Sequence, residues 1–276
     1  MRHVVLPDGA RLPALGQGTW RMGEDPARRR EEVASLREGI ERGLTVLDTA
    51  EMYAEGESER VVGEAIAGMR GQAFIVSKFY PHNATRRGLP LACERSLARL
   101  GIERLDLYLL HWRGGVPLEE TVEALERLVA QGKIARWGVS NFDVEDLEEL
   151  GPALGRCATD QVLLSLEHRG AGFGLLPFCR ARGMPVMAYS PLGQGGRLLM
   201  NRRLREVAAA RGLSPAQMAL AWVLDQPGVL AIPKAADAAH LRANAAAAEV
   251  ELTGAERAAL DAIFPPPTRK RPLEMI

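Results

Sequence analysis

The sequence predicts an α/β fold, a closed (β/α)8 barrel, from three observations. Short apolar runs alternate eight times with helical patterns, which is typical of a parallel sheet covered by helices. The length of 276 residues suits one undivided barrel. Three of the apolar runs end on Asp48, Lys78 and His111, as expected where the loops of a barrel carry a reaction. We therefore expect a single domain, residues 1–276.

An N-terminal hairpin precedes the repeat. Residues 4–12 form two extended segments around Asp8-Gly9, a dipeptide suited to a tight turn with positive φ. Because no helical pattern comes before them, we expect the hairpin to lie across the floor of the barrel.

The strands and helices then follow in alternation. Strands are expected in the apolar runs 14–20, 44–49, 73–78, 104–111, 134–140, 159–165, 185–190 and 229–233. Helices are expected at 30–42, 58–67, around 91–100, at 117–130, after Asp143, at 175–181 and at 237–248.

Two further helical features break the plain repeat. Between the last two strands lie one helix near 204–210 and another opened by Ser214-Pro215, a good N-cap with proline at N1. A last helix opens at Thr253 with Glu256 three residues on, a capping-box pattern. The sequence thus predicts two extra helices, one after strand seven and one at the C-terminus.

Composition excludes several classes of protein. Lys+Arg and Asp+Glu balance at 35 each, which argues against nucleic-acid binding. The three scattered cysteines, Cys93, Cys157 and Cys179, form no disulfide framework, so a reducing compartment is expected. No export signal or membrane-spanning run is present. We expect a soluble, cytoplasmic monomer without a metal site.

The side chains at the strand ends suit proton donation, with Tyr53 as the candidate acid. A free phenol has a pKa of about 10, and a cation within ~4–6 Å lowers it. Lys78 supplies that charge, and Asp48 keeps Lys78 in place and protonated. A drop of about two units would correspond to ~2.7 kcal/mol. Neutral His111 would donate a hydrogen bond to a substrate carbonyl.

Each of these residues also has a plainer interpretation when it is taken alone. Asp48 could cap a helix, and Tyr53 could pack on an amphipathic face. Lys78 could be a solvated charge, and His111 beside Trp112 could be a core histidine. Their conjunction at consecutive strand ends favours a shared site.

A nicotinamide cofactor is implied, but not through a Rossmann loop. The two G-x-G pairs, at 16–18 and 193–195, lack the third glycine and open no βαβ unit. Groups that suit the cofactor lie near later strand ends: Ser140, Asn141 and Gln161 for a carboxamide, Tyr189 for ring stacking, and the backbone N–H groups of 192–196 for a pyrophosphate. An ordinary flexible turn is the plainer interpretation of 192–196.

Together these residues resemble the aldo-keto reductase superfamily over nearly the whole chain, from the hairpin to Thr253. The chain looks closest to bacterial NADPH-dependent reductases of small α-oxoaldehydes such as methylglyoxal. The motifs that carry the resemblance are Gly18-Thr19-Trp20, Leu47-Asp48-Thr49-Ala50 followed by Tyr53, Val76-Ser77-Lys78, Leu109-Leu110-His111-Trp112, Gly132-Lys133-Ile134, Gly138-Val139-Ser140-Asn141-Phe142, Tyr189-Ser190-Pro191-Leu192 and Ile232-Pro233-Lys234.

The resemblance implies an oxidoreductase that reduces small aldehydes and activated ketones to alcohols with NADPH. Tyr53 is then the general acid, Lys78 and Asp48 tune it, and His111 positions the carbonyl. Trp20 and Trp112 would bound the substrate together with Tyr53 and His111. The implied cofactor contacts are Gly18, Thr19, Trp20, Asp48, Ser140, Asn141, Gln161, Tyr189, Ser190, Leu192, Gln194, Lys234, His240 and Asn244.

One region departs from the family pattern. Where the family often has Ser, Arg and Glu-Asn after Ile-Pro-Lys, this chain has Ala235, His240 and Ala243-Asn244. A histidine binds a 2′-phosphate less firmly than arginine, because its charge varies with pH. NADPH is the expected cofactor, and NADH remains an alternative.

The pocket is expected to be open. The loop 112–117 is short and only twelve residues follow Phe264, so little chain is available for a lid; Phe79 and Tyr80 are expected near the pocket. An alternative is a nucleotide-binding regulatory or partner-binding protein on the same scaffold, with little turnover. The full set of four polar side chains favours the enzyme over this alternative, and over a phosphate-sugar barrel enzyme.

Overall fold

The structure, a computed structural model, describes all residues 1–276 and forms the expected closed barrel. Its eight parallel strands pair in chain order, and isolated bridges from Leu15 to Ala231 and from Gly18 to Lys234 join the first strand to the last. A β-carbon at Gly18 would lie 2.6 Å from the carbonyl oxygen of Ile232, so the barrel closes this tightly only on glycine. The strands are β3 (Gln17–Gly18), β4 (Val46–Asp48), β5 (Phe74–Phe79), β6 (Leu107–Leu110), β7 (Trp137–Ser140), β8 (Asp160–Leu163), β9 (Val186–Tyr189) and β10 (Val229–Ala231).

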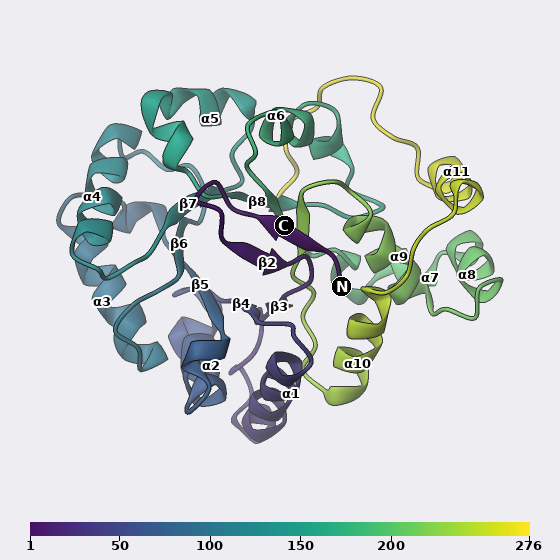
Figure 1. Ribbon diagram of the computed structural model, residues 1–276, viewed down its shortest axis with the longest axis horizontal. Helices are drawn as coiled ribbons and strands as arrows, with labels where there is room; N and C mark the ends of the chain where they lie inside the picture. The colour runs from purple at the N-terminus through teal and green to yellow at the C-terminus, as the bar shows by residue number, and fades with distance from the viewer.

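Helices surround the barrel on all sides (Figure 1). Those that follow single strands are α1 (Arg29–Glu41), α2 (Glu57–Ile66), α3 (Gly88–Leu100), α4 (Leu118–Ala130), α5 (Val144–Glu149), α6 (Leu175–Ala181) and α10 (Ala238–Ala247). Between β9 and β10 lie α7 (Arg197–Met200), α8 (Arg202–Ala209) and α9 (Pro215–Leu224), and α11 (Gly254–Ile263) ends the helical part. The expected extra helices are confirmed; the single turn α7 is an addition that the sequence did not predict.

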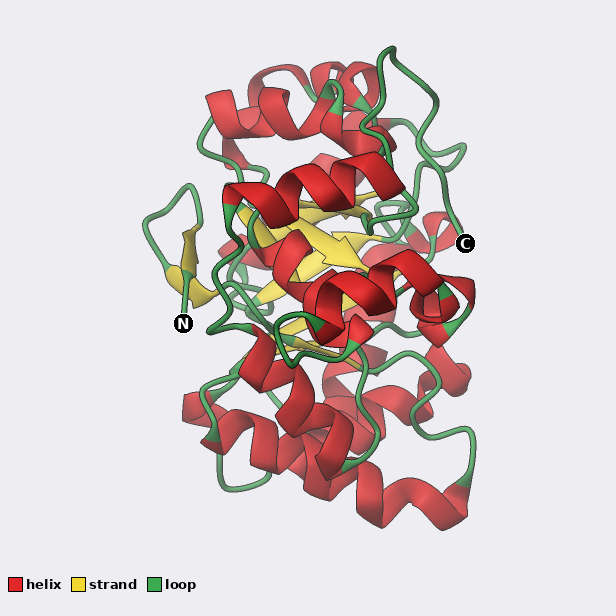
Figure 2. Ribbon diagram, turned by 90° about the vertical axis from the view of Figure 1, so that its right-hand side faces the viewer, coloured by secondary structure: helices red, strands yellow, loops and turns green.

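The predicted N-terminal hairpin is confirmed. It consists of β1 (His3–Val5) and β2 (Arg11–Pro13), which pair antiparallel, and Gly9 in its turn has φ +89°. Figure 2 shows the hairpin at one end of the barrel and the C-terminus at the other. Its inward side chains, Val4 and Leu12, are buried, so it seals the floor of the barrel.

The strands divide their side chains between two apolar clusters. Val46, Val76 and Leu109 pack with the hairpin residues, inside the barrel. Side chains from the opposite faces of the strands, such as Leu47 and Ile75, pack instead with the helices. Because strand side chains alternate between faces, Asp48 and Lys78, two residues beyond Val46 and Val76, point into the barrel.

The C-terminal tail returns from α11 to the mouth of the barrel, opposite the hairpin (Figures 1 and 2). Leu273 packs against the outer apolar cluster, and Glu274 lies 2.9 Å from His168. Lys270 pairs with Glu145 at the start of α5. The twelve residues judged too few for a lid thus reach the centre of the mouth. No helix is both long and apolar enough to cross a bilayer.

Candidate active site

Three neighbouring strands deliver polar side chains to the mouth of the barrel. Asp48 is the last residue of β4, Lys78 the penultimate residue of β5, and His111 follows β6 directly. The parallel register pairs Asp48 with Val76 and Lys78 with Leu109, so each group lies two residues further along its strand than the one before it. The structure therefore brings together the side chains that the sequence placed at consecutive strand ends.

Lys78 is the centre of this cluster. Its Nζ donates hydrogen bonds to Asp48 Oδ2 at 2.7 Å, to the Thr49 carbonyl at 2.9 Å and to the Tyr53 hydroxyl at 3.1 Å. An ammonium has three N–H donors, so each one is used. The side chains of Lys78 and Asp48 are 0% and 3% exposed. Burial alone would lower the pKa of Lys78. The nearby Asp48 and Tyr53 raise that pKa by more, which keeps Lys78 charged.

Tyr53 reaches Lys78 from an unusual loop. It opens a short 3₁₀ segment, Tyr53–Gly56, in which Ala54 and Glu55 have φ of +47° and +54°. Left-handed backbone at non-glycine residues costs on the order of 1–3 kcal/mol per residue, so surrounding contacts must hold this loop. Gly56, with φ +93°, then leads into α2.

The expected drop in the pKa of Tyr53 is wrong. Desolvation of the hydroxyl raises the pKa above its usual value; Lys78 lowers it, and the charge of Asp48 adds to the rise. The sequence identified the cation, Lys78, but not how deeply the Tyr53 hydroxyl is buried, and that burial decides whether the pKa rises or falls. Tyr53 is therefore a protonated phenol at neutral pH. Lys78 makes its ionisation easier than it would be if the hydroxyl were buried without a cation nearby.

His111 is neutral, as the sequence analysis expected. Desolvation of the ring, together with nearby Lys78, lowers the pKa of His111 well below 6.5. Its ring lies edge-on to Tyr53, with centroids 5.9 Å apart, and 4.9 Å from the Trp112 ring. A neutral imidazole beside a phenol can donate a second hydrogen bond to one carbonyl oxygen.

Aromatic side chains form part of the wall around this pair. Tyr80 stacks on His82 at 4.8 Å and meets Trp112 edge-on at 5.9 Å. Trp20, the other tryptophan expected at the substrate, is 38% exposed, so part of its ring faces solvent. Phe79, expected near the pocket, is instead buried against Tyr108 outside the barrel, because it alternates with the inward-pointing Lys78.

The predicted carboxamide-binding residues form one hydrogen-bonded group. Asn141 Nδ2 donates to the His111 carbonyl and to Ser140 Oγ, and Asn141 Oδ1 accepts from Tyr189 at 2.9 Å. Ser140 Oγ donates to the Gln161 carbonyl. Desolvation raises the pKa of Tyr189 to about 12, and the backbone of Ile276 opposes that rise. The tail thus ends against the predicted stacking residue.

Gln161 differs from the other three in having an acceptor to spare. Its Nε2 donates to Asp48 Oδ1 at 2.7 Å, which links β8 to the Lys78 cluster across the barrel. Its Oε1 accepts no hydrogen bond from the protein and is not sealed from solvent. Asn141 and Ser190 have φ of +61° and +46°, backbone conformations that concentrate at functional sites.

Some residues expected at the cofactor serve the fold in this structure. The Thr19 hydroxyl is buried and donates to the Asp48 carbonyl. The N–H groups of Gly193, Gly195 and Gly196 bond within their own loop, which closes most of the expected pyrophosphate cradle in this conformation. Leu192 and Gln194 stay at the surface of that loop, beside Ser190.

The residues expected at the 2′-phosphate lie near the start of α10. Lys234 is exposed, Asn244 is buried, and His240 is largely exposed. His240 Nδ1 lies 2.6 Å from Asp237 Oδ2, the N-cap carboxylate of α10. The histidine is therefore engaged by a carboxylate rather than free.

The structure adds one supporting residue that the sequence analysis missed. Glu51 is buried and accepts hydrogen bonds from the Tyr80 N–H and from Asn83 Nδ2, which fixes the loop after β5. Its place between Asp48 and Tyr53 in the chain was the available signal.

Comparison with known proteins agrees with this geometry. The sequence model of the aldo/keto reductase family matches residues 14–264. The chain belongs to the aldo/keto reductase family. The matched part of this aldo/keto reductase contains the whole barrel and every site residue named above except Ile276, whereas the hairpin and the tail lie outside it.

Relatives of this aldo/keto reductase include named enzymes. It is 56% identical to the methylglyoxal reductase YeaE of Escherichia coli, over 96% of this chain and 95% of that protein. It is 34% identical to the glyoxal reductase of Bacillus subtilis, over 94% and 92%. A crystal structure of an aldo/keto reductase from Klebsiella pneumoniae in complex with NADP and acetate superposes with a TM-score of 0.97 at 53% identity, covering 99% of each chain.

Proposed function

We propose that this protein reduces small α-oxoaldehydes, with methylglyoxal as the representative, to alcohols with NADPH. The observation that carries the proposal is Lys78 Nζ, which lies between Asp48 Oδ2 and the Tyr53 hydroxyl at the mouth of the barrel. The relatives named for methylglyoxal and glyoxal reduction support the substrate class.

The side chains divide the work on the carbonyl. When bound, NADPH supplies a hydride from C4 of its nicotinamide. Tyr53 donates its proton to the carbonyl oxygen, and Lys78 stabilises the phenolate as it forms. Asp48 keeps Lys78 charged and fixed. Neutral His111 orients the carbonyl by a hydrogen bond.

The chain's own groups fit a bound dinucleotide. Gln161 Oε1 has no protein donor and suits the N–H of a carboxamide, while Ser140 and Asn141 border the same position. Tyr189 offers its ring face for stacking. Ser190, Leu192 and Gln194 would follow the pyrophosphate, and Lys234, His240 and Asn244 the 2′-phosphate. Gly18, Thr19 and Trp20 would border the same site, where closure of the barrel already engages the Gly18 backbone and the Thr19 hydroxyl.

The pocket suits small, uncharged carbonyl compounds. Trp112 and Tyr80 present aromatic surface beside His111, with Trp20 as a further wall. Arg113 is committed to the carbonyls of Gly114 and Val116 and to Glu149, so it offers no free charge to an anionic substrate.

The test measures loss of NADPH absorbance with methylglyoxal for the native protein and for Tyr53→Phe. We expect Tyr53→Phe to lower kcat about 10²–10⁴-fold, the range for loss of a general acid, with NADPH binding retained. Tyr108→Phe is the matched control, because Tyr108 is a buried tyrosine that packs with the helices on the outer face of β6, away from the site. An undiminished rate in Tyr53→Phe removes Tyr53 as the acid. No consumption by the native protein with a panel of aldehydes favours the binding-protein alternative.

We also propose a compartment and an oligomeric state for this enzyme. The three cysteines are buried and free, which suits a reducing cytoplasm. We place the whole chain in one domain that acts as a monomer, since every catalytic side chain comes from one barrel. Light scattering coupled to size-exclusion chromatography tests this, and a stable dimer would contradict it.

A further inference from the structure

The Tyr53 loop is closed by backbone turns, in which the Tyr53 N–H bonds to the Ala50 carbonyl and the Glu55 N–H to the Met52 carbonyl. Two consecutive left-handed residues, Ala54 and Glu55, separate Tyr53 from Gly56, and Glu55 is exposed. The hydrogen bond from Lys78 reaches only the tip of the Tyr53 side chain. The Glu51 N–H, bonded to the Lys78 carbonyl, ties the start of the loop to β5, so contacts at the end of the loop complete the placement of the phenol.

Glu59, in the first turn of α2, provides such a contact. Its side chain is 0% exposed, although most glutamates lie at the surface. Oε1 accepts a hydrogen bond from Ser77 Oγ at 2.5 Å, and Oε2 accepts one from Arg99 Nε at 2.5 Å. Ser77 immediately precedes Lys78 in β5, so Glu59 ties α2 to the strand that carries the cation.

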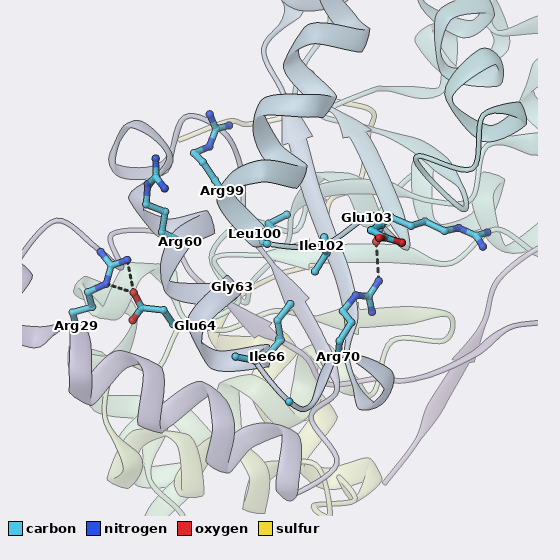
Figure 3. A pocket seen from close by; sticks show the side chains of 14 residues that line it. Arg29, Arg60, Gly63, Glu64, Ile66, Arg70, Arg99, Leu100, Ile102 and Glu103 are labelled. Carbon is cyan, nitrogen blue, oxygen red and sulfur yellow. Dashed lines mark hydrogen bonds and ion pairs between the residues drawn. The ribbon is translucent and has the colours of Figure 1, made fainter.

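Arg99, near the end of α3, completes the connection. A β-carbon at Gly56 would lie 2.5 Å from Arg99 Cδ and 2.6 Å from Nε, so the arginine packs directly on the Gly56 backbone. Figure 3 shows Arg99 at one end of an outer groove of about 830 Å³ between α2 and α3, apart from the Arg29–Glu64 pair. The guanidinium thus braces the loop from outside while Glu59 holds the guanidinium.

We propose that Glu59 and Arg99 are positioning residues that hold the Tyr53 hydroxyl against Lys78. Glu59 fixes Arg99 and the Lys78 strand together, and Arg99 presses Gly56, and with it the Tyr53 loop, towards that strand. Neither residue touches substrate or cofactor. This inference rests on the proposed function, because it assigns the pair to the acid of that reaction.

The test compares Glu59→Gln with the native protein. Glutamine keeps an acceptor for Ser77 but loses the ion pair with Arg99. We expect kcat with methylglyoxal to fall about tenfold, with the KM for NADPH within about twofold, because a small displacement of an acid lowers the rate without loss of binding. In the Tyr53→Phe background, the same substitution changes kcat no further. Arg99→Lys retains part of the rate that Arg99→Met loses.

A titration separates positioning from mere stability. Ultraviolet absorbance of tyrosinate, taken as the difference between each protein and its Tyr53→Phe version, follows Tyr53 alone. We expect a higher midpoint in Glu59→Gln, since the phenol moves away from Lys78. Glu206→Gln is the control, because Glu206 lies on α8 in an exposed pair with Arg202, apart from the Tyr53 loop.

The outcomes are distinct. A Glu59→Gln protein that loses stability but keeps the native kcat and the native Tyr53 midpoint overturns the inference. If the native protein consumes no NADPH, the proposed function fails, whereas the titration still reports whether Glu59 and Arg99 place Tyr53 beside Lys78.

Discussion

Gln161 Nε2 donates a 2.7 Å hydrogen bond to Asp48 Oδ1, although the two residues lie 113 positions apart in the chain. Asp48 Oδ2 is occupied by Lys78, so the carboxylate receives one donor on each oxygen. Desolvation raises the pKa of Asp48, and both donors oppose that rise. Gln161, which was expected only to hold the carboxamide, therefore also fixes the Asp48 carboxylate that supports Lys78 and Tyr53.

Substitution Gln161→Leu separates these two roles. Without cofactor, we expect it to lower the free energy of unfolding by about 1–3 kcal/mol, because Asp48 Oδ1 loses its donor while buried. NADPH binding should weaken about tenfold through loss of Oε1, about the value of one hydrogen bond. Urea unfolding of the cofactor-free protein and fluorescence titration with NADPH measure the two effects. Unchanged stability would show that Gln161 does not support Asp48.

Substitution Lys78→Met should destabilise the protein as well as inactivate it. Breaking a buried ion pair from one side typically costs about 3–5 kcal/mol, because the other charge stays buried and unpaired. With Lys78 gone, the pKa of folded Asp48 rises further above its unfolded value. Stability then falls as pH rises, since the folded state must release a proton that it holds more tightly.

Thermal unfolding of Lys78→Met between acid and alkaline pH checks this sign. The double variant Asp48→Asn/Lys78→Met removes both charges and should recover most of the stability but none of the activity. If Lys78→Met loses the same stability at every pH, an uncompensated Asp48 carboxylate is not the cause of the loss.

Substitution His240→Arg should strengthen the preference for NADPH over NADH. His240 is held at 2.6 Å by Asp237 and lies in the helix expected at the 2′-phosphate. An arginine offers a permanent charge and several N–H donors, and one charge-assisted bond corresponds to about tenfold in kcat/KM. Arg242→Lys is the control, because Arg242 pairs with Glu38 on α1. An unchanged ratio of the two cofactors would place the 2′-phosphate elsewhere.

Substitution Asp160→Asn should stabilise the protein at neutral pH. The Asp160 side chain is buried on the helix side of β8, where Oδ1 meets the Phe142 N–H at 3.4 Å and Oδ2 has no partner. Desolvation raises its pKa well above the usual value. The folded state therefore binds the proton more tightly than the unfolded state, and the stability from that proton is lost as pH rises.

We expect Asp160→Asn to gain roughly 1–3 kcal/mol at pH 7, the usual cost of an unpaired buried polar group, and little near pH 2.5, which is well below the unfolded pKa of about 3.9, so that the carboxyl is protonated in both states. Calorimetry at the two pH values measures the difference. An equal gain at both would indicate that charge at Asp160 is not the cause.

Much of the fold could be predicted from the sequence, because apolar strands alternate regularly with helical segments. Polar residues that end apolar runs, Asp48, Lys78 and His111, located the mouth of the barrel. The capping pair Thr253 and Glu256 located the last helix, with both reciprocal bonds present. These are local signals, and local signals survive in a single sequence.

The errors came from quantities that depend on the assembled fold. The sign of the pKa shift at Tyr53 follows from its desolvation, which no local pattern reports. The path of the tail to the mouth was not predicted, because its contacts, such as Lys270 with Glu145, join residues far apart in the chain. Phe79 is an error of another kind, because its alternation with Lys78 in the same strand was a local signal that would have turned it outward.

The two ends of the chain lie at opposite ends of the barrel, with the hairpin on the floor and Ile276 beside Tyr189 at the mouth. An affinity tag or fusion partner at Met1 would extend away from the catalytic opening. The same addition after Ile276 would emerge from it, and would obstruct entry or pull the last residues from their seat. We therefore expect a C-terminal tag to change the kinetic constants and an N-terminal tag to leave them unchanged.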